Sequence, residues 1–167
     1  GAWAYKVFDG VIQTGLTGTE TGRYTLSQST TVPPNTGHRQ SMKIDITTAD
    51  TSIASDHWYY LQWPIEAQNC SHLQYGESGA KSLTASFWVR STTTGDYQFM
   101  LKQQDASRQY STGYTIDSAN TWQKITLTIP GDTDASAAIN NDTGAGLQAN
   151  IIPQCCAGQK QINEAVA

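Results

Sequence analysis

The chain of 167 residues is long enough for one domain with a hydrophobic core, and only 14% of its residues are charged. Its formal net charge is −4 and its pI is about 5.2, with no run of lysine or arginine, so phosphate-directed binding of nucleic acid is disfavoured. No apolar stretch approaches the length of a membrane span, so no membrane insertion is predicted.

Alternating apolar residues predict a series of short strands along the chain. The inward-facing sets are Met42, Ile44 and Ile46; Tyr59, Leu61, Trp63 and Ile65; Leu83, Ala85, Phe87 and Val89; Tyr97, Phe99 and Leu101; Tyr110, Thr112, Tyr114 and Ile116; and Ile125, Leu127 and Ile129. From these sets we expect a core that contains Ile44, Leu61, Trp63, Phe87, Val89, Phe99, Leu127 and Ile129. Trp122 is out of phase with the last set, which predicts a bulge or a strand that begins after it.

Turn-forming residues separate the predicted strands at 33–37, 94–96 and 130–132. The one segment with helical character is 66–73, a turn or two in length. About eight short strands joined by turns predict an all-β fold, an antiparallel β-sandwich of the jelly-roll type, with residues 1–152 as a single domain.

Three cysteines, Cys70, Cys155 and Cys156, do not predict a disulfide framework, because their number is odd and adjacent cysteines rarely bond to each other. The three histidines lack the spacing of a zinc site. We therefore expect free thiols and no zinc.

A central block of sequence carries a family resemblance. It reads YYLQWPIEAQN at 59–69, HL at 72–73 and AKSLTASFWVRS at 80–91. This block resembles the YxxQxIEGQN…HL…AKSLTLSFWVKS stretch of a family of bacteriophage structural proteins, and the similarity covers about residues 24–148. The resemblance implies a jelly roll related to carbohydrate-binding modules, located in a tail fibre or another virion protein.

The chain departs from that family in two places. Ala67 stands where the family usually has glycine, and the similarity stops near Asn150. There the family would continue with an aromatic-rich strand, a loop and a last strand, so the resemblance implies a truncated, frame-shifted or divergent end. Leu147, Ala149 and Ile151 still alternate and predict one more short strand, whereas 153–167 is expected to form an irregular tail. A missing closing strand would also lower the stability of the domain.

Carbohydrate-binding modules bind sugars by stacking exposed aromatic side chains on the sugar rings. Five aromatic residues that lie off the clearest core positions, or near their ends, are candidates for this role: Trp58, Tyr60, Tyr75, Trp88 and Tyr110. The alternative for each of them is packing in the core or under a loop.

The acidic residues do not form the pair that a glycosidase needs. Glu66 follows a predicted strand, and we expect it to act with Asn69 as a structural anchor, through hydrogen bonds, rather than as a catalyst. Asp132 and Asp142 are candidate ligands of a structural calcium ion, with a solvated loop as the alternative, and no other cofactor is predicted.

Three functions are compatible with these features. The first is a non-catalytic structural or adhesive module of a virion, whose partners are other virion proteins, copies of itself and host surface polysaccharide. The second is a carbohydrate-binding module of a secreted glycan-degrading enzyme. The third, which the missing acid pair disfavours, is a jelly-roll hydrolase or lyase.

Overall fold

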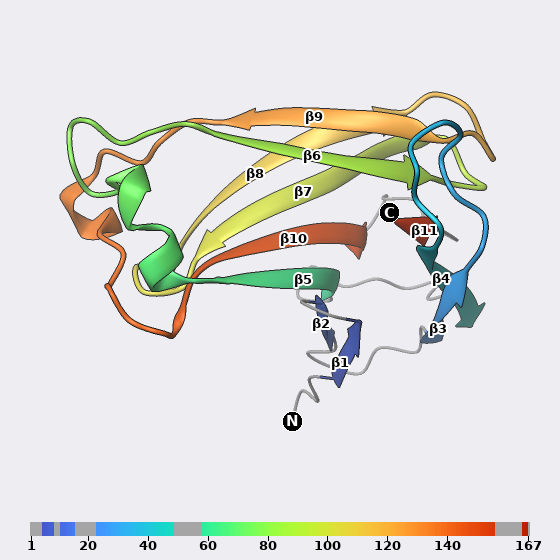
Figure 1. The fold of residues 1–167 in the computed structure, drawn as a ribbon, viewed down its shortest axis with the longest axis horizontal. Coiled ribbons are helices and arrows are strands. Elements are labelled where there is room, and N and C mark those ends of the chain that lie inside the picture. The colour runs from blue at the N-terminus through green and yellow to red at the C-terminus, as the bar shows by residue number, and fades with distance from the viewer. Residues whose placement is uncertain (1–4, 9–10, 16–22, 49–57, 156–164, 167) are drawn as a thin grey trace.

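The computed structural model describes residues 5–8, 11–15, 23–48, 58–155 and 165–166, which form two antiparallel sheets (Figure 1). The six-stranded sheet has the order β1 (Tyr5–Phe8), β2 (Val11–Gly15), β5 (Trp58–Glu66), β10 (Ala145–Cys155), β7 (Gly95–Gln103) and β8 (Arg108–Ile116). The five-stranded sheet has the order β3 (Arg23–Ser29), β4 (Ser41–Thr48), β11 (Ala165–Val166), β6 (Leu83–Arg90) and β9 (Gln123–Ile129). The predicted all-β antiparallel sandwich is confirmed.

The strands with long apolar alternation lie where the sequence predicts them. β9 begins at Gln123, directly after the out-of-phase Trp122. The pattern does not predict β1, β2, β3 or β11. β1, β2 and β11 have only four, five and two residues, and β3 carries only two apolar residues in alternation, Tyr24 and Leu26.

The predicted helical segment forms two 3-10 turns, η1 (Ala67–Asn69) and η2 (Ser71–Leu73). Their buried residues are Ala67 and Leu73, so only one side chain of each turn reaches the core. A third turn, η3 (Ala135–Ala137), follows β9. None of the helices in the described part of the chain is long and apolar enough to cross a membrane.

Aromatic side chains hold the two sheets together. The ring of Phe87 on β6 lies 6.0 Å from that of Phe99 and 5.4 Å from that of Tyr114, both on the opposite sheet. Of the eight expected core residues, Ile44, Leu61, Val89, Phe99 and Ile129 are buried, and Trp63, Phe87 and Leu127 are partly buried against them. The alternation therefore identifies the inner faces of both sheets correctly.

The central strand of the five-stranded sheet, β11, has only two residues. β11 pairs with β4 only at Lys43 and Met42, and with β6 only at Arg90 and Val89. On the side facing β11, residues 83–88 of β6 have no partner strand among the described residues. The expectation of an irregular tail over 153–167 is wrong for both described parts of that segment, because β10 continues to Cys155 in its pairing with β5 and Ala165–Val166 forms β11. The rest of that tail, 156–164 and 167, lies outside the described residues.

The ends of several strands meet at one end of the sandwich. Figure 1 shows the ends of β7 and β9 and the start of β8 at the end that also carries η1 and η2. At this end, the inward-facing residues of β7 and β8 form two cross-strand pairs, Leu101 with Tyr110 and Gln103 with Arg108. Polar side chains on an inward face need hydrogen-bond partners, so this end is where a binding site can form.

Candidate functional site

A pocket with a volume of about 260 Å³ opens at this end, between β8 and the segment that follows β9. Its floor includes the buried side chains of Leu101 and Ile129. Tyr110, which is 38% exposed, and Pro130 contribute further apolar surface. The remaining lining residues are Tyr75, Gln103, Arg108, Gln109, Gly131 and Asp132. The lining therefore combines apolar surface with charged and amide side chains, and ligand pockets use both kinds of group.

An ion pair forms the polar end of the pocket. Arg108 Nε donates to Asp132 Oδ2 at 2.6 Å, and Arg108 Nη2 donates to Asp132 Oδ1 at 3.1 Å. Arg108 Nη1 lies 3.5 Å from Asp134 Oδ2. The hydrogen bond from Arg108 lowers the pKa of the Asp132 carboxyl and raises the pKa of Arg108 itself. The pair therefore stays charged across the physiological pH range.

Two close contacts between backbone segments, at Gly76 and Gly131, fix the positions of Tyr75 and Asp132. Gly76 has a φ of +88° and donates its N–H to the Asp132 carbonyl at 2.9 Å, which joins the turn after η2 to the segment after β9. A Cβ on Gly131 would lie 2.5 Å from the carbonyl carbon of Ala80. Only glycine fits there without moving the backbone, so the loop carrying Asp132 packs closely against the segment that precedes β6.

Two buried polar atoms that belong to lining residues have no hydrogen-bond partner within the described structure. They are the hydroxyl oxygen of Tyr75 and Oε1 of Gln103, whose residues are 6% and 5% exposed. Burial, and then the nearby Asp132 charge, raise the pKa of Tyr75, so its hydroxyl keeps its proton. An unpaired buried polar group lowers the stability of the fold by about 1–3 kcal/mol.

The structure does not bring the five candidate aromatic residues onto one surface. Tyr75 and Tyr110 both line the pocket. Tyr60 packs on the outer face of the six-stranded sheet, beside the buried cluster of Met100 and Ile152. Trp88 is half-buried on the outer face of β6, opposite Lys124 of β9.

Trp58 belongs to β5, but its side chain lies outside the described part of the structure. Two of the five candidates therefore contribute to the same site, and they come from different segments of the chain.

Glu66 and Asn69 form a local cluster at the surface rather than a partly buried anchor. Both residues are exposed, and Glu66 Oε2 accepts hydrogen bonds from Gln68 Nε2 at 2.9 Å and Asn69 Nδ2 at 3.4 Å. The anchoring at this turn comes instead from the backbone, because the Ala67 N–H donates to Gly144 O at 2.8 Å and the Gln68 N–H to Asp142 O at 2.9 Å.

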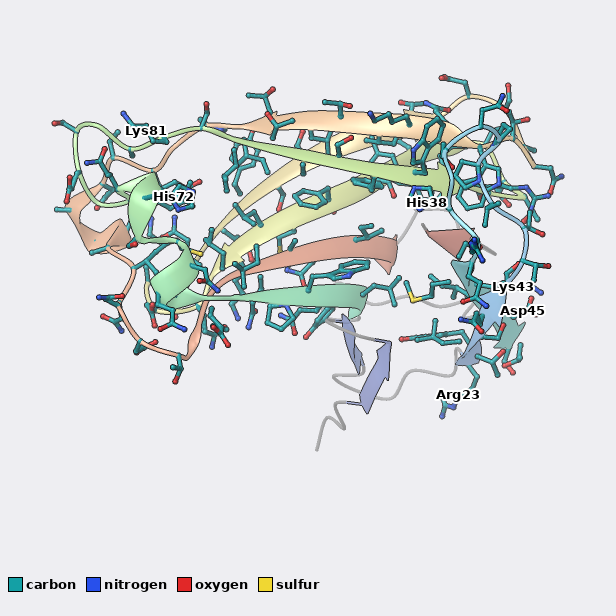
Figure 2. All side chains as sticks on the ribbon, viewed as in Figure 1. Arg23, His38, Lys43, Asp45, His72 and Lys81 are labelled. Carbon is teal, nitrogen blue, oxygen red and sulfur yellow. The ribbon has the colours of Figure 1, made fainter. Side chains whose placement is uncertain are left out.

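The candidate calcium ligands have other partners. Asp132 pairs with Arg108, and Asp142 Oδ1 accepts the N–H of Gly144 at 2.9 Å. The described residues contain no group of three or more histidine, cysteine, aspartate or glutamate side chains that could hold a metal ion. Figure 2 shows His38 and His72 toward opposite ends of the molecule, and Cys70 is a buried free thiol.

The sequence pattern also indicates Gln103 and Arg108, which are not among the predicted site residues. The alternation of Tyr97, Phe99 and Leu101 continues to Gln103, and that of Tyr114, Thr112 and Tyr110 continues back to Arg108. Polar residues at the end of an inward-facing series are buried beside other polar groups or line a site.

Comparison with solved structures supports the fold. The enzymatically active domain of tailspike protein 4 of bacteriophage CBA120 superposes with a TM-score of 0.51 at 13% identity, over 93% of this chain. This chain spans only 18% of that tailspike structure. The family 11 carbohydrate-binding module of the cellulosomal cellulase Lic26A-Cel5E of Clostridium thermocellum superposes with a TM-score of 0.50 at 13% identity, over 99% of this chain and 90% of that module.

At such low identity these similarities establish a shared sandwich fold. No protein-family model matches the sequence, and no curated protein sequence matches it.

Proposed function

We propose that this chain is a non-catalytic carbohydrate-binding module and that one sugar unit occupies the pocket at the end of β8. The observation that carries the proposal is an exposed aromatic ring, Tyr110, in the same pocket as the polar side chains of Gln109 and Asp132. A sugar ring has apolar C–H faces and a hydroxyl rim, and it needs both kinds of partner.

The size and the lining of the pocket suit a single sugar ring. Tyr110, Pro130 and the floor residues Leu101 and Ile129 offer apolar surface to the C–H groups of a sugar. The volume of about 260 Å³ lies just below the range of about 300–1,000 Å³ typical of pockets for drug-sized ligands. A site of this size binds weakly on its own, and several copies on one particle would raise the overall avidity.

We place the module in a virion, in a tail fibre or a similar extracellular structure, with other virion proteins or copies of itself as partners. The resemblance of residues 24–148 to bacteriophage structural proteins supports this placement, and so does the fold shared with part of a phage tailspike. In that setting the ligand is a polysaccharide of the host surface.

The alternative is a module of a secreted glycan-degrading enzyme. It is favoured by the superposition on a cellulase module over nearly the whole of both chains. The neighbouring genes separate the two, because tail and capsid genes support the first function and glycosidase domains support the second.

A glycan array probed with a multimerised form of this chain tests the proposed function. We expect binding to at least one polysaccharide without release of reducing sugar, because no acid pair or nucleophile motif is present in the sequence. Glu66→Gln should leave both results unchanged. No binding on the array would contradict the proposal, and so would glycan turnover that Glu66→Gln abolishes.

A further inference from the structure

One edge of β6 is open over most of its length. β6 is paired with β9 from Leu83 to Val89, but on its other side only Val89 and Arg90 have a partner strand, β11. In an antiparallel sheet every second residue of a strand directs its N–H and C=O to the same side. Over 83–88 the groups on the β11 side have no strand partner in the described part of the chain, and such groups are a template for a further strand.

The apolar face of β6 becomes more exposed where β11 ends. The inward-facing residues of this strand are Leu83, Ala85, Phe87 and Val89. Val89 lies opposite Val166 of β11 and is 0% exposed. The other three lie past the end of β11 and are only partly buried, although they pack against the same core cluster. A strand in line with β11 would cover them.

The opposite sheet shows the same trend along β5. Leu61 is 0% exposed, Trp63 is partly buried and Ile65 is 38% exposed, although all three belong to one alternating set. Ile65 lies next to η1, and Figure 1 shows β11 at the end of the sandwich opposite η1 and η2. On both strands the apolar residues therefore lose cover with distance from β11.

The open position suits a single strand rather than the edge of a second sheet. At β11 the position is one strand wide, because Ala165 is paired with Lys43 of β4 on one side and with Arg90 of β6 on the other. Each described strand of this chain is hydrogen-bonded into one of its own two sheets. A second copy could offer from these strands only one that is attached to a whole sheet, so a separate extended segment fits better.

We propose that an extended segment of another polypeptide chain binds along residues 83–88 of β6, antiparallel to β6 and in line with β11. Its apolar side chains occur at every second position, in phase with Val166, and cover Leu83, Ala85 and Phe87. The side chains between them are polar, because Thr84 and Ser86, on the other face of β6, are exposed. The inference does not depend on sugar binding in the pocket.

A synthetic peptide added to the whole chain tests the proposal. The probe is a capped peptide of about eight residues in which valine alternates with threonine and lysine. By NMR it should slow hydrogen exchange about tenfold or more at those amides of 83–88 that point to the open side, because they gain hydrogen bonds.

Two control peptides separate alternation from general stickiness. One has the same residues in an order without alternation, and the other carries N-methyl groups on the amides that would face β6. Both should bind at least about tenfold more weakly than the probe, because the first cannot place all its valines on one face and the second cannot donate to the backbone of β6.

Two variants of the chain locate the site. Ala85→Lys places a charge on the apolar face beneath the open position and should weaken probe binding about tenfold. Thr126→Lys is the matched control, because Thr126 is exposed on β9, opposite Ser86, and this variant should bind as the wild type does. If Ala85→Lys does not fold, the two control peptides still decide the question.

Three results would overturn the proposal. The first is equal binding of the alternating peptide and the reordered one, and the second is slowed exchange on β3 or β8 instead of β6. The third is slow exchange at 83–88 before any peptide is added. If that protection depends on protein concentration, a second copy occupies the position, and if it does not, the chain itself does.

Discussion

Leu61→Ala is expected to lower the free energy of unfolding by about 3–5 kcal/mol. Leu61 is 0% exposed and lies in β5, between β2 and β10, where its side chain belongs to the main core cluster. Truncation removes buried methyl groups and leaves a cavity between two sheets that cannot easily close. Denaturant unfolding, followed by tryptophan fluorescence, measures the loss.

Ile65→Ala is the matched control for this prediction. Ile65 lies four residues further along the same strand and belongs to the same alternating set, but it is 38% exposed. The control should lose less than about 1.5 kcal/mol, because the side chain is only partly removed from water. Equal losses for the two variants would mean that β5 does not face the core as described.

Tyr75→Phe is expected to leave the free energy of unfolding unchanged or to raise it by up to about 1 kcal/mol, and to leave glycan binding within about twofold of the wild type. The substitution removes one hydroxyl that is buried without a hydrogen-bond partner within the described structure and leaves the ring in place. The hydroxyl therefore contributes no hydrogen bond to the folded state, and a ligand in the pocket does not reach it. Glycan titration and denaturant unfolding of the same samples measure both quantities.

Tyr97→Phe provides the opposite case at the other end of β7. The Tyr97 hydroxyl donates to Thr93 O at 2.7 Å and lies 3.0 Å from Ser91 Oγ, so its loss should cost about 1–2 kcal/mol of stability and leave binding unchanged. If Tyr75→Phe instead destabilises the domain by as much as Tyr97→Phe does, the Tyr75 hydroxyl is structural and its description as an unpaired group is wrong.

The inner faces of the sheets could be predicted from the sequence. When apolar and polar residues alternate over many positions, only one assignment of residues to the two faces of a strand buries all the apolar ones. From β4 to β10 the apolar residues recur at every second position, and one slip would expose the whole set. The short strands β1 and β2 carry too few alternating residues for such a pattern, and they pair at one edge of the six-stranded sheet.

The pocket could be predicted only in part. Tyr110 and Tyr75 were identifiable as aromatic residues off the clearest core positions, but nothing local shows that they meet. Their meeting depends on a hairpin register that aligns Gln103 with Arg108 and on backbone contacts that bring Asp132 to Gly76. Such long-range contacts depend on how the two sheets pack, which a one-dimensional pattern does not contain.

The assignment of Asp132 shows the same limit. As one of several acids in a polar loop it is a reasonable calcium ligand, because oxygen-rich loops hold this ion. Its partner Arg108 lies 24 residues earlier in the chain, on a strand of the opposite sheet from β9. The ion pair, rather than the local sequence, determines the role of this carboxylate.

The central claim, that the pocket at the end of β8 binds a sugar, is tested most directly by an NMR titration of the isotopically labelled chain. The titrant is a neutral oligosaccharide that binds on the glycan array. The claim predicts that the largest shifts fall on the Gln103 side-chain amide and on the backbone amides of Tyr110 and Gly131. Shifts that centre on Tyr60, Met100 and Ile152 instead, on the outer face of the six-stranded sheet, with the pocket signals unmoved, would contradict it.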